Sequence, residues 1–309
     1  MFPTAFLSLG RKQVNEPTMS ECAVILVLAH KSDIKPEEAL ALSQCASILG
    51  GHDIVVVCPS GMDVSKYREI SDKIKYCHIH PWWQRTYDNF NRLKISPLLY
   101  WKFRRYDFIL FYELDAFVFK DELNYWCSSG YDYIGAPWFY GFNDCTIESP
   151  VLGVGNGGFS LRRTSSALRV LRSFSYIWKP RELFQPRRVP KELANVMSWE
   201  VGKRNRRCYS LRSIIYDFVS GNNTFYLLND FGINEDFFWG LIVPRNFSWF
   251  KVAPPDTARR FSIECNPRRL FEANGNQLPF GCHAWQKYDP EFWDPHIARS
   301  AGQPDSLFT

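Results

Sequence analysis

A strand, a helix and a second strand within about 35 residues limit the fold of this chain more than any other feature. Residues 23–28 form a continuous apolar run, residues 36–49 carry apolar side chains at helical spacing, and the second strand, residues 53–58, is apolar from Ile54 onward. A proline in the first turn and two glycines after the last turn mark the ends of the helix. Strands without polar alternation are typical of parallel sheets covered on both faces. The pattern predicts a βαβ unit and an α/β fold.

The remaining pattern extends this sheet over most of the chain. We expect further strands at 75–80, 107–119, 132–137 and 156–161, and helices at 87–105, from 164 onward and at 234–242. We therefore predict a Rossmann-like mixed central sheet flanked by helices.

The predicted domain organisation is one catalytic domain between two short ends. Residues 1–20 are polar and irregular and are expected to form a flexible arm, residues 21–295 the domain, and residues 296–309 a tail. Residues 179–212 contain three prolines and many Lys and Arg, which indicates a basic insertion or lid outside the sheet.

Composition excludes several classes of protein. Hydrophobic residues make up 46% and charged residues 22% of the chain, which excludes general disorder. The net charge of +5 is small for a nucleic-acid-binding protein, so we expect no nucleic acid partner. No apolar run approaches the ~20 residues that span a bilayer, so we expect no transmembrane segment. The nine cysteines form no Cys-x-x-Cys pair, which favours reduced thiols in the cytoplasm.

Two carboxylates, Glu113 and Asp115, interrupt the apolar run of residues 107–119. Residues two apart in a strand point to the same side, and parallel sheets bind ligands beyond the carboxyl ends of their strands. Buried carboxylates need a partner, and Mg²⁺ or Mn²⁺ prefers oxygen ligands and would neutralise a diphosphate. The structural alternative is that one acid caps a helix and the other pairs with an arginine.

A glycine-rich string, Val154-Gly-Asn-Gly-Gly-Phe-Ser-Leu-Arg-Arg163, is the second candidate. Its three glycines around Asn156 permit close approach of the backbone to a ligand. The spacing matches neither a dinucleotide-binding fingerprint nor a Walker loop. A tight turn without a ligand is the alternative.

Two further candidates follow later in the chain. Glu235 and Asp236 would supply a general base, or would act as the acidic first turn of a helix. His283 lies between aromatic residues and would be either a hydrogen-bonded core residue or a third metal ligand.

Taken in order, these strings resemble glycosyltransferases of the A-type (GT-A) fold. Tyr131-Asp-Tyr-Ile-Gly-Ala-Pro-Trp138, Gly155-Asn-Gly-Gly-Phe-Ser-Leu-Arg162, Asn234-Glu-Asp-Phe-Phe and Phe280-Gly-Cys-His283 are similar to a largely bacterial family of such domains. The resemblance covers residues 22–290.

On the donor side, the resemblance implies that Asp115 is the principal metal ligand and that His283 completes the metal site. Glu113 would contact the metal, its water or the donor ribose, although the family usually has the shorter Asp at that position. Gly157 and Gly158 would form the floor near the sugar and the acceptor.

For the acceptor side, the resemblance assigns Asp236 as the catalytic base of an inverting reaction and Glu235 as the residue that holds the acceptor sugar, two roles that are interchangeable. The end of the first strand, at Ala29, His30 and Lys31, would bind the nucleotide base.

The sequence therefore predicts a metal-dependent glycosyltransferase that uses Mn²⁺ or Mg²⁺. It would move a hexosyl residue, galactose-type by weak preference, from a UDP-sugar to a saccharide or lipid-linked saccharide. The resemblance implies bacterial surface polysaccharide synthesis in the cytoplasm, with peripheral contact at the inner face of the membrane. The alternatives are a catalytically degenerate nucleotide-sugar or carbohydrate-binding module, and a metal-dependent hydrolase or nucleotidyltransferase.

Overall fold

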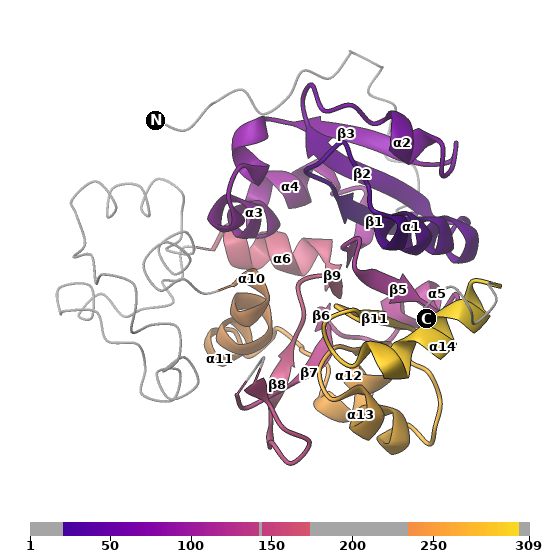
Figure 1. Cartoon of the computed structure of the whole chain (residues 1–309). Coiled ribbons are helices and arrows are strands. Elements are labelled where there is room, and N and C mark those ends of the chain that lie inside the picture. Colours follow the sequence, from indigo (N-terminus) through magenta and orange to yellow (C-terminus); the bar gives the residue numbers. More distant parts are fainter. Residues whose placement is uncertain (1–20, 142–143, 174–233, 303–309) are drawn as a thin grey trace.

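A six-stranded mixed sheet forms the centre of the molecule (Figure 1). The computed structural model describes residues 21–141, 144–173 and 234–302. The sheet has the order β3-β2-β1-β4-β9-β6, with β1 (Glu21–Leu28), β2 (Asp53–Pro59), β3 (Lys75–Ile79), β4 (Tyr106–Tyr112), β6 (Tyr133–Ile134) and β9 (Phe159–Arg163). The first four strands are parallel to their neighbours, whereas β9 runs antiparallel to β4 and β6 antiparallel to β9. The predicted α/β fold with a mixed central sheet is confirmed.

Helices lie around this sheet and continue into the C-terminal part (Figure 1). They are α1 (Pro36–Ile48), α2 (Ser65–Arg68), α3 (Tyr87–Lys94), α4 (Pro97–Lys102), α5 (Leu123–Cys127), α6 (Thr164–Leu171), α10 (Glu235–Phe237), α11 (Val243–Asn246), α12 (Pro255–Phe261), α13 (Pro267–Ala273) and α14 (Pro290–Ser300), with a 3-10 turn at Pro81–Gln84 and a π-helical turn at Phe238–Ile242. In the described residues, no helix is long and apolar enough to cross a membrane.

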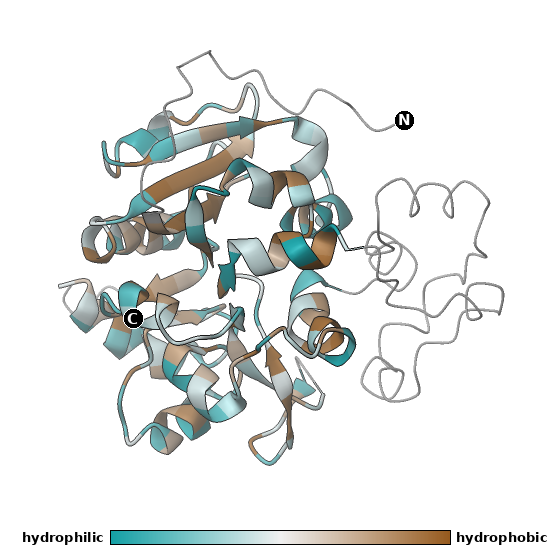
Figure 2. Cartoon of the chain, turned by 180° about the vertical axis from the view of Figure 1, so that it is seen from behind, coloured by the Kyte–Doolittle hydropathy of each residue, from teal (hydrophilic) through white to brown (hydrophobic). Residues whose placement is uncertain are grey.

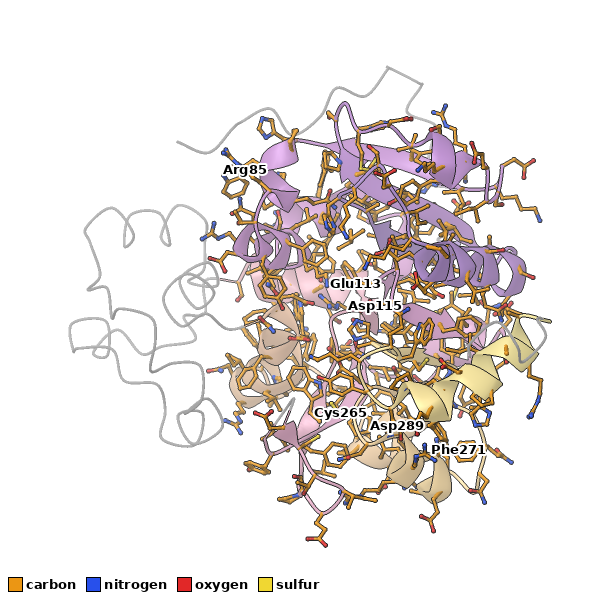
Figure 3. All side chains as sticks on the ribbon, in the orientation of Figure 1. Arg85, Glu113, Asp115, Cys265, Phe271 and Asp289 are labelled. Carbon is orange, nitrogen blue, oxygen red and sulfur yellow. The ribbon has the colours of Figure 1, made fainter. Side chains whose placement is uncertain are left out.

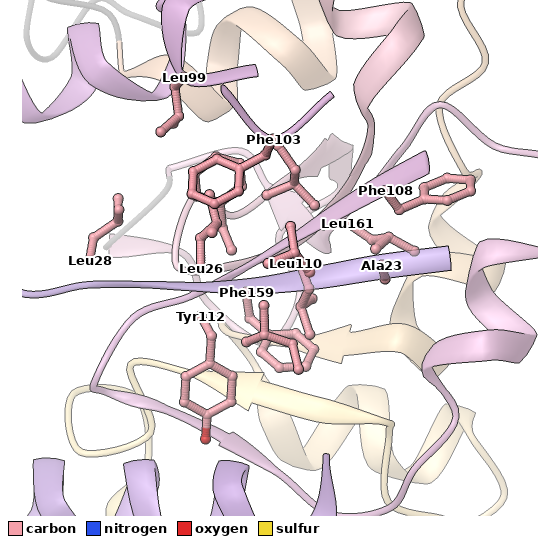
Figure 4. Packing of buried hydrophobic residues seen from close by; sticks show 14 of the residues in the cluster. Ala23, Leu26, Leu28, Leu99, Phe103, Phe108, Leu110, Tyr112, Phe159 and Leu161 are labelled. Atoms are coloured by element: carbon pink, nitrogen blue, oxygen red, sulfur yellow. The ribbon is translucent and has the colours of Figure 1, made fainter. Parts of the chain in front are cut away.

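The predicted βαβ unit is present and is held by apolar burial. Residues 24–27 of β1 are completely buried, and they pair with β2 on one side and β4 on the other. Side chains of β1, β4 and β9 pack together in the core seen in Figure 4. Hydrophobic residues follow the strands, and hydrophilic residues lie mainly on helices and connections (Figure 2). Burial of these apolar strands explains why the pattern predicted their positions.

The predicted strand at 107–119 is wrong in one respect, because it is two strands. β4 ends at Tyr112, and β5 (Ala116–Val118) joins a different sheet. Between them the chain turns, and the Ala116 N–H donates to the Glu113 carbonyl oxygen at 2.9 Å. The two carboxylates thus lie in a turn at the end of β4 instead of inside a strand.

The predicted helix at 87–105 is also divided. α3 ends at Lys94, and α4 begins at Pro97 after Ser96, whose hydroxyl accepts a hydrogen bond from the Leu98 N–H at 3.3 Å. Proline disfavours helical geometry in the residue before it, so a new helix begins at this point. The break places Lys94 at the end of α3, where its side chain is buried.

Two smaller sheets complete the described residues. β10 (Ser262–Ile263), β11 (Gly281–His283) and β5 form one, and β7 (Ala136–Phe139) and β8 (Val151–Gly155) form the other. The division expected at residue 295 falls inside α14, whose Ile297 and Ala298 are buried. The arm at 1–20 and the basic segment at 179–212 lie outside the described residues, so both stay predictions.

Candidate active site

Glu113, Asp115 and His283 come together although His283 follows Glu113 by 170 positions in the chain (283 − 113). His283 Nε2 lies 3.2 Å from Asp115 Oδ1 and 4.0 Å from Glu113 Oε2. One ligand atom from each residue lies within 4.8 Å of the others. Glu113 and Asp115 lie next to each other near the centre of the molecule in Figure 3. The three residues expected to hold a metal are therefore neighbours.

Backbone hydrogen bonds fix this arrangement. The Glu113 N–H donates to the Gly158 carbonyl oxygen at 2.7 Å, and the Ala284 N–H donates to the Asp115 carbonyl oxygen at 3.0 Å. The antiparallel pairing of β11 with β5 places His283 opposite Ala116. The acids and the histidine converge because a turn and a sheet register bring them together, and not because the acids alternate along one strand.

The residues present fit a divalent cation. His283 Nε2 is buried and, although Asp115 is near, makes no hydrogen bond of normal geometry. A Cβ atom on Gly158 would lie 2.0 Å from this nitrogen, so glycine is required beside it. Two carboxylates and an imidazole are a donor set that suits Mn²⁺ and Mg²⁺.

The electrostatics of this group are those of a histidine paired with carboxylates. Burial lowers the pKa of His283, but Asp115 and Glu264 outweigh it and raise that pKa well above its usual value. Burial raises the pKa of Asp115, whereas the His283 imidazolium lowers it, with a net result of about 2. The histidine thus supplies positive charge to a cluster of acids.

Next to the acids, the glycine-rich string forms a tight turn. Asn156 has a left-handed backbone with φ of 89°, and its Oδ1 accepts hydrogen bonds from the N–H groups of Gly158 and Phe159, each at 3.0 Å. A Cβ atom on Gly157 would lie 2.3 Å from Glu235 Oε1, so the lack of a side chain lets α10 approach the turn. The predicted floor at Gly157 and Gly158 therefore lies between the two acidic groups.

Asp236 contacts this turn at Gly157. Its Oδ2 accepts the Gly157 N–H at 2.8 Å, and its Oδ1 accepts the Phe237 N–H at 2.8 Å. The side chain is partly buried. Burial, followed by the neighbouring charges of Glu235 and Glu264, raises the pKa of Asp236 to about 7. A carboxyl group with this pKa is suited to accept a proton near neutral pH.

Glu235 points into the protein. Its side chain is 1% exposed, and Oε2 lies 2.7 Å from the Arg162 guanidinium while Oε1 lies 3.4 Å from Lys94 Nζ. Its backbone N–H donates to Asn91 Oδ1 at 3.0 Å. The carboxylate is paired with two internal cations, which favours a role in anchoring α10 over contact with an acceptor sugar.

Lys94 links the two acidic groups. Its ammonium donates to Glu113 Oε1 and, at 3.0 Å, to the Gly157 carbonyl oxygen, in addition to its pairing with Glu235. The side chain is 3% exposed. Burial lowers the pKa of Lys94, but Glu113 and Glu235 outweigh it, so the pKa is raised and the side chain remains charged.

Lys94, Arg162 and Glu264 were not among the predicted site residues. Arg162 belongs to the glycine-rich string and lies in β9, and a charged residue within a strand of the central sheet is a signal that could have identified it. Lys94 and Glu264 resemble surface residues in the sequence.

The predicted nucleotide-binding residues lie at the carboxyl end of β1. Ala29 is buried and donates its N–H to the Val57 carbonyl oxygen at 3.0 Å, whereas His30 and Lys31 are exposed. Burial and then the charge of Lys31 lower the pKa of His30, while Glu113 is near enough to act in the opposite direction. This end of β1 is thus electrostatically coupled to the acidic cluster.

The chain belongs to a protein family whose model matches residues 73–283. That family is described as "Protein of unknown function (DUF5672)". The matched segment contains all the acids of the site and His283. A comparison with curated proteins finds no significant match.

Several solved structures are similar to the chain at low sequence identity. The galactosyltransferase LgtC, in complex with donor and acceptor sugar analogues, has a TM-score of 0.46 and 11% identity over 90% of this chain and 95% of that chain. The bifunctional glycosyltransferase WbbM has a TM-score of 0.46 and 14% identity over 96% of this chain and 52% of that chain. GlyE of Streptococcus pneumoniae has a TM-score of 0.44 and 10% identity over 93% of this chain and 62% of that chain.

Proposed function

We propose that this protein is a metal-dependent glycosyltransferase that moves a hexosyl residue from a nucleotide sugar to a saccharide. One observation carries the proposal. The possible metal ligands and the carboxyl group with a pKa near 7 adjoin the same glycine turn, since Gly158 packs on His283 and the Gly157 N–H donates to Asp236 Oδ2. A displacement reaction needs the group that stabilises the leaving group and the base that activates the attacking hydroxyl to lie close together.

On the donor side, Asp115 and His283 would hold Mn²⁺ or Mg²⁺, with Glu113 at the metal or its water. The cation, when bound, supplies Lewis-acid stabilisation of a departing nucleoside diphosphate. Lys94 keeps Glu113 in place from within the protein. The exposed His30 beyond β1 would contact the nucleotide base.

On the acceptor side, Asp236 would accept the proton of the attacking hydroxyl. The acceptor oxygen forms a bond to the anomeric carbon while the bond from that carbon to the diphosphate oxygen breaks, and the hydroxyl proton goes to the Asp236 carboxylate. Attack from the side opposite to the leaving group inverts the anomeric centre. The two backbone N–H groups on Asp236 hold its carboxyl group in position for this transfer.

The choice of UDP and of a galactose-type sugar rests on the motif resemblance alone. So do a saccharide or lipid-linked acceptor, bacterial surface polysaccharide synthesis and a cytoplasmic site at the inner face of the membrane. They belong to the same proposal and are tested separately from the chemistry.

The test is a panel of nucleotide sugars with Mn²⁺ or Mg²⁺, read out by release of the nucleoside diphosphate and by mass of the glycosylated product. We expect metal-dependent release with at least one donor, and loss of it in Asp115→Ala. Full activity in the presence of a chelator would exclude the metal role. Release in water without transfer to any saccharide would indicate a hydrolase, and donor binding without turnover would indicate a binding module.

A further inference from the structure

We propose that Glu264 is a positioning residue that orients His283 for metal binding. This inference rests on the proposed metal site. Glu264 itself does not belong to the motifs that identified the other site residues.

The His283 ring connects Glu264 to the predicted metal ligands, because each of its two nitrogens faces one carboxylate. Glu264 Oε1 lies 3.0 Å from His283 Nδ1, and Nε2, on the opposite side of the same ring, faces Asp115 at 3.2 Å. An imidazole that donates its Nδ1–H to a carboxylate presents its other nitrogen as the ligand atom. The direction of the ring is therefore determined by Glu264.

Glu264 itself has a fixed place. It follows β10, whose Ile263 is paired with Cys282 in the parallel register with β11, so Glu264 and His283 are the next two residues along the two strands. Their side chains are 13% and 12% exposed. Because both groups are largely withdrawn from water, their contact is less screened than a surface pair would be.

The second oxygen of Glu264 is held by an indole. Trp138 Nε1–H donates to Glu264 Oε2 at 3.0 Å. The Trp138 ring lies against Gly155, where an added Cβ would lie 2.4 Å from ring atoms. The three glycines of the turn thus each make room for one part of the site, and Gly155 serves the support of the histidine.

Loss of this support has a measurable consequence. Without Glu264, His283 Nδ1 loses its acceptor and the ring loses the contact that directs Nε2 toward the acids. Removal of such a carboxylate from a metal-binding histidine weakens metal affinity by about 10- to 100-fold.

The experiment measures Mn²⁺ binding by titration calorimetry in the full chain, without donor or acceptor. The variants are Glu264→Ala, Glu264→Gln, His283→Ala and the double variant Glu264→Ala/His283→Ala, with Glu272→Ala on the exposed face of α13 as the matched control. We expect Glu264→Ala to weaken Mn²⁺ binding at least tenfold and Glu264→Gln less, because an amide oxygen can still accept from Nδ1–H. Glu272→Ala should bind as the wild type does.

A second readout needs no metal. Imidazole ¹⁵N shifts of the six histidines, with His283 assigned from His283→Ala, should change for His283 in Glu264→Ala and stay unchanged in Glu272→Ala. Far-UV circular dichroism confirms folding, and Glu264→Gln keeps the test valid if the alanine variant does not fold.

The outcomes separate this inference from the proposed function. Wild-type Mn²⁺ affinity in Glu264→Ala would overturn it while leaving the metal site intact. Equal weakening by Glu264→Ala in the presence and absence of His283 would also overturn it, since Glu264 would then act as a ligand or as a remote charge. If the wild type binds no Mn²⁺, the metal role in the proposed function fails and this inference fails with it; if it binds Mn²⁺ but no nucleotide sugar, only the transferase proposal fails.

Discussion

Gly158 packs so closely on His283 that an added Cβ atom would lie 2.0 Å from Nε2. The predicted metal site therefore depends on a residue that has no side chain. A side chain at position 158 would displace the nitrogen that lies 3.2 Å from Asp115 Oδ1.

Gly158→Ala should displace His283 and weaken Mn²⁺ binding at least tenfold. Because the added methyl group has no space, we also expect the free energy of unfolding to fall by about 1–3 kcal/mol. Calorimetric titration and urea unfolding measure the two effects. Gly51→Ala is the control, since no atom lies within 4 Å of the Cβ position there; an equal loss in both variants would contradict the steric explanation.

Arg162→Met should lower the free energy of unfolding by about 3 kcal/mol, because it leaves the buried Glu235 carboxylate with Lys94 alone. Urea unfolding monitored by tryptophan fluorescence measures the change. Arg162→Met combined with Glu235→Leu should recover much of the loss, since no buried charge is then left without its partner. Lys66→Met, which removes an exposed ion pair with Asp33, should have no measurable effect. A double variant less stable than Arg162→Met would show that the pair is not the cause.

Asp236→Asn should abolish transfer, by about 10²- to 10⁴-fold, while nucleotide-sugar binding stays normal. In the wild type the rate should rise with pH through about 7, because burial and Glu235 hold the pKa of Asp236 at that value and only the ionised form accepts a proton. Initial rates from pH 5 to 9, at saturating donor and acceptor, measure the profile. A flat profile, or wild-type turnover in the variant, would remove Asp236 as the base.

Asp236 should also make the metal-free protein less stable as pH rises. Its pKa is raised from 3.8 to about 7 in the folded state, so between these values the folded protein keeps a proton that the unfolded chain has released. The free energy of unfolding therefore decreases from about pH 4 to pH 7 through this group. Asp236→Asn should lack this pH-dependent decrease in the free energy of unfolding. The stability of the variant relative to the wild type should therefore increase as pH rises. Urea unfolding at pH 4, 5.5 and 7.5 tests this; a difference that does not grow with pH would contradict the raised pKa.

The sequence predicted the sheet well because its strands are buried on both faces. Residues 23–28 and 54–58 are apolar without alternation, which is typical of strands in a parallel sheet covered on both faces. Residues 107–119 were predicted as a single strand because apolar residues continue past Glu113. The turn between β4 and β5 becomes evident only from the pairing of β5 with β11. The hydrophobic pattern along the chain does not show that β4 and β5 belong to different sheets.

The sequence selected only some of the residues that the structure brings together, because contacts between distant parts of the chain leave no local pattern. Acids and glycines in a recognisable order identify Asp115 and Asp236, but their separation along the chain says nothing about distance. Lys94 and Glu264 act through partners that lie 19 residues away in the chain, at Glu113 and His283 respectively. Because charged residues are mostly exposed, a sequence offers no signal that these two are buried.

The backbone turn between Gly155 and Gly158 contacts both His283 and the acidic residues of α10. Trp138 packs on its first residue, Glu235 and Asp236 approach its third, and His283 packs on its fourth. The position of His283 relative to Asp236 therefore depends on main-chain atoms of this turn. If the proposed transfer takes place here, side-chain substitutions around the site would change which sugars it accepts, but changing the separation between metal ligands and base would require rebuilding the turn.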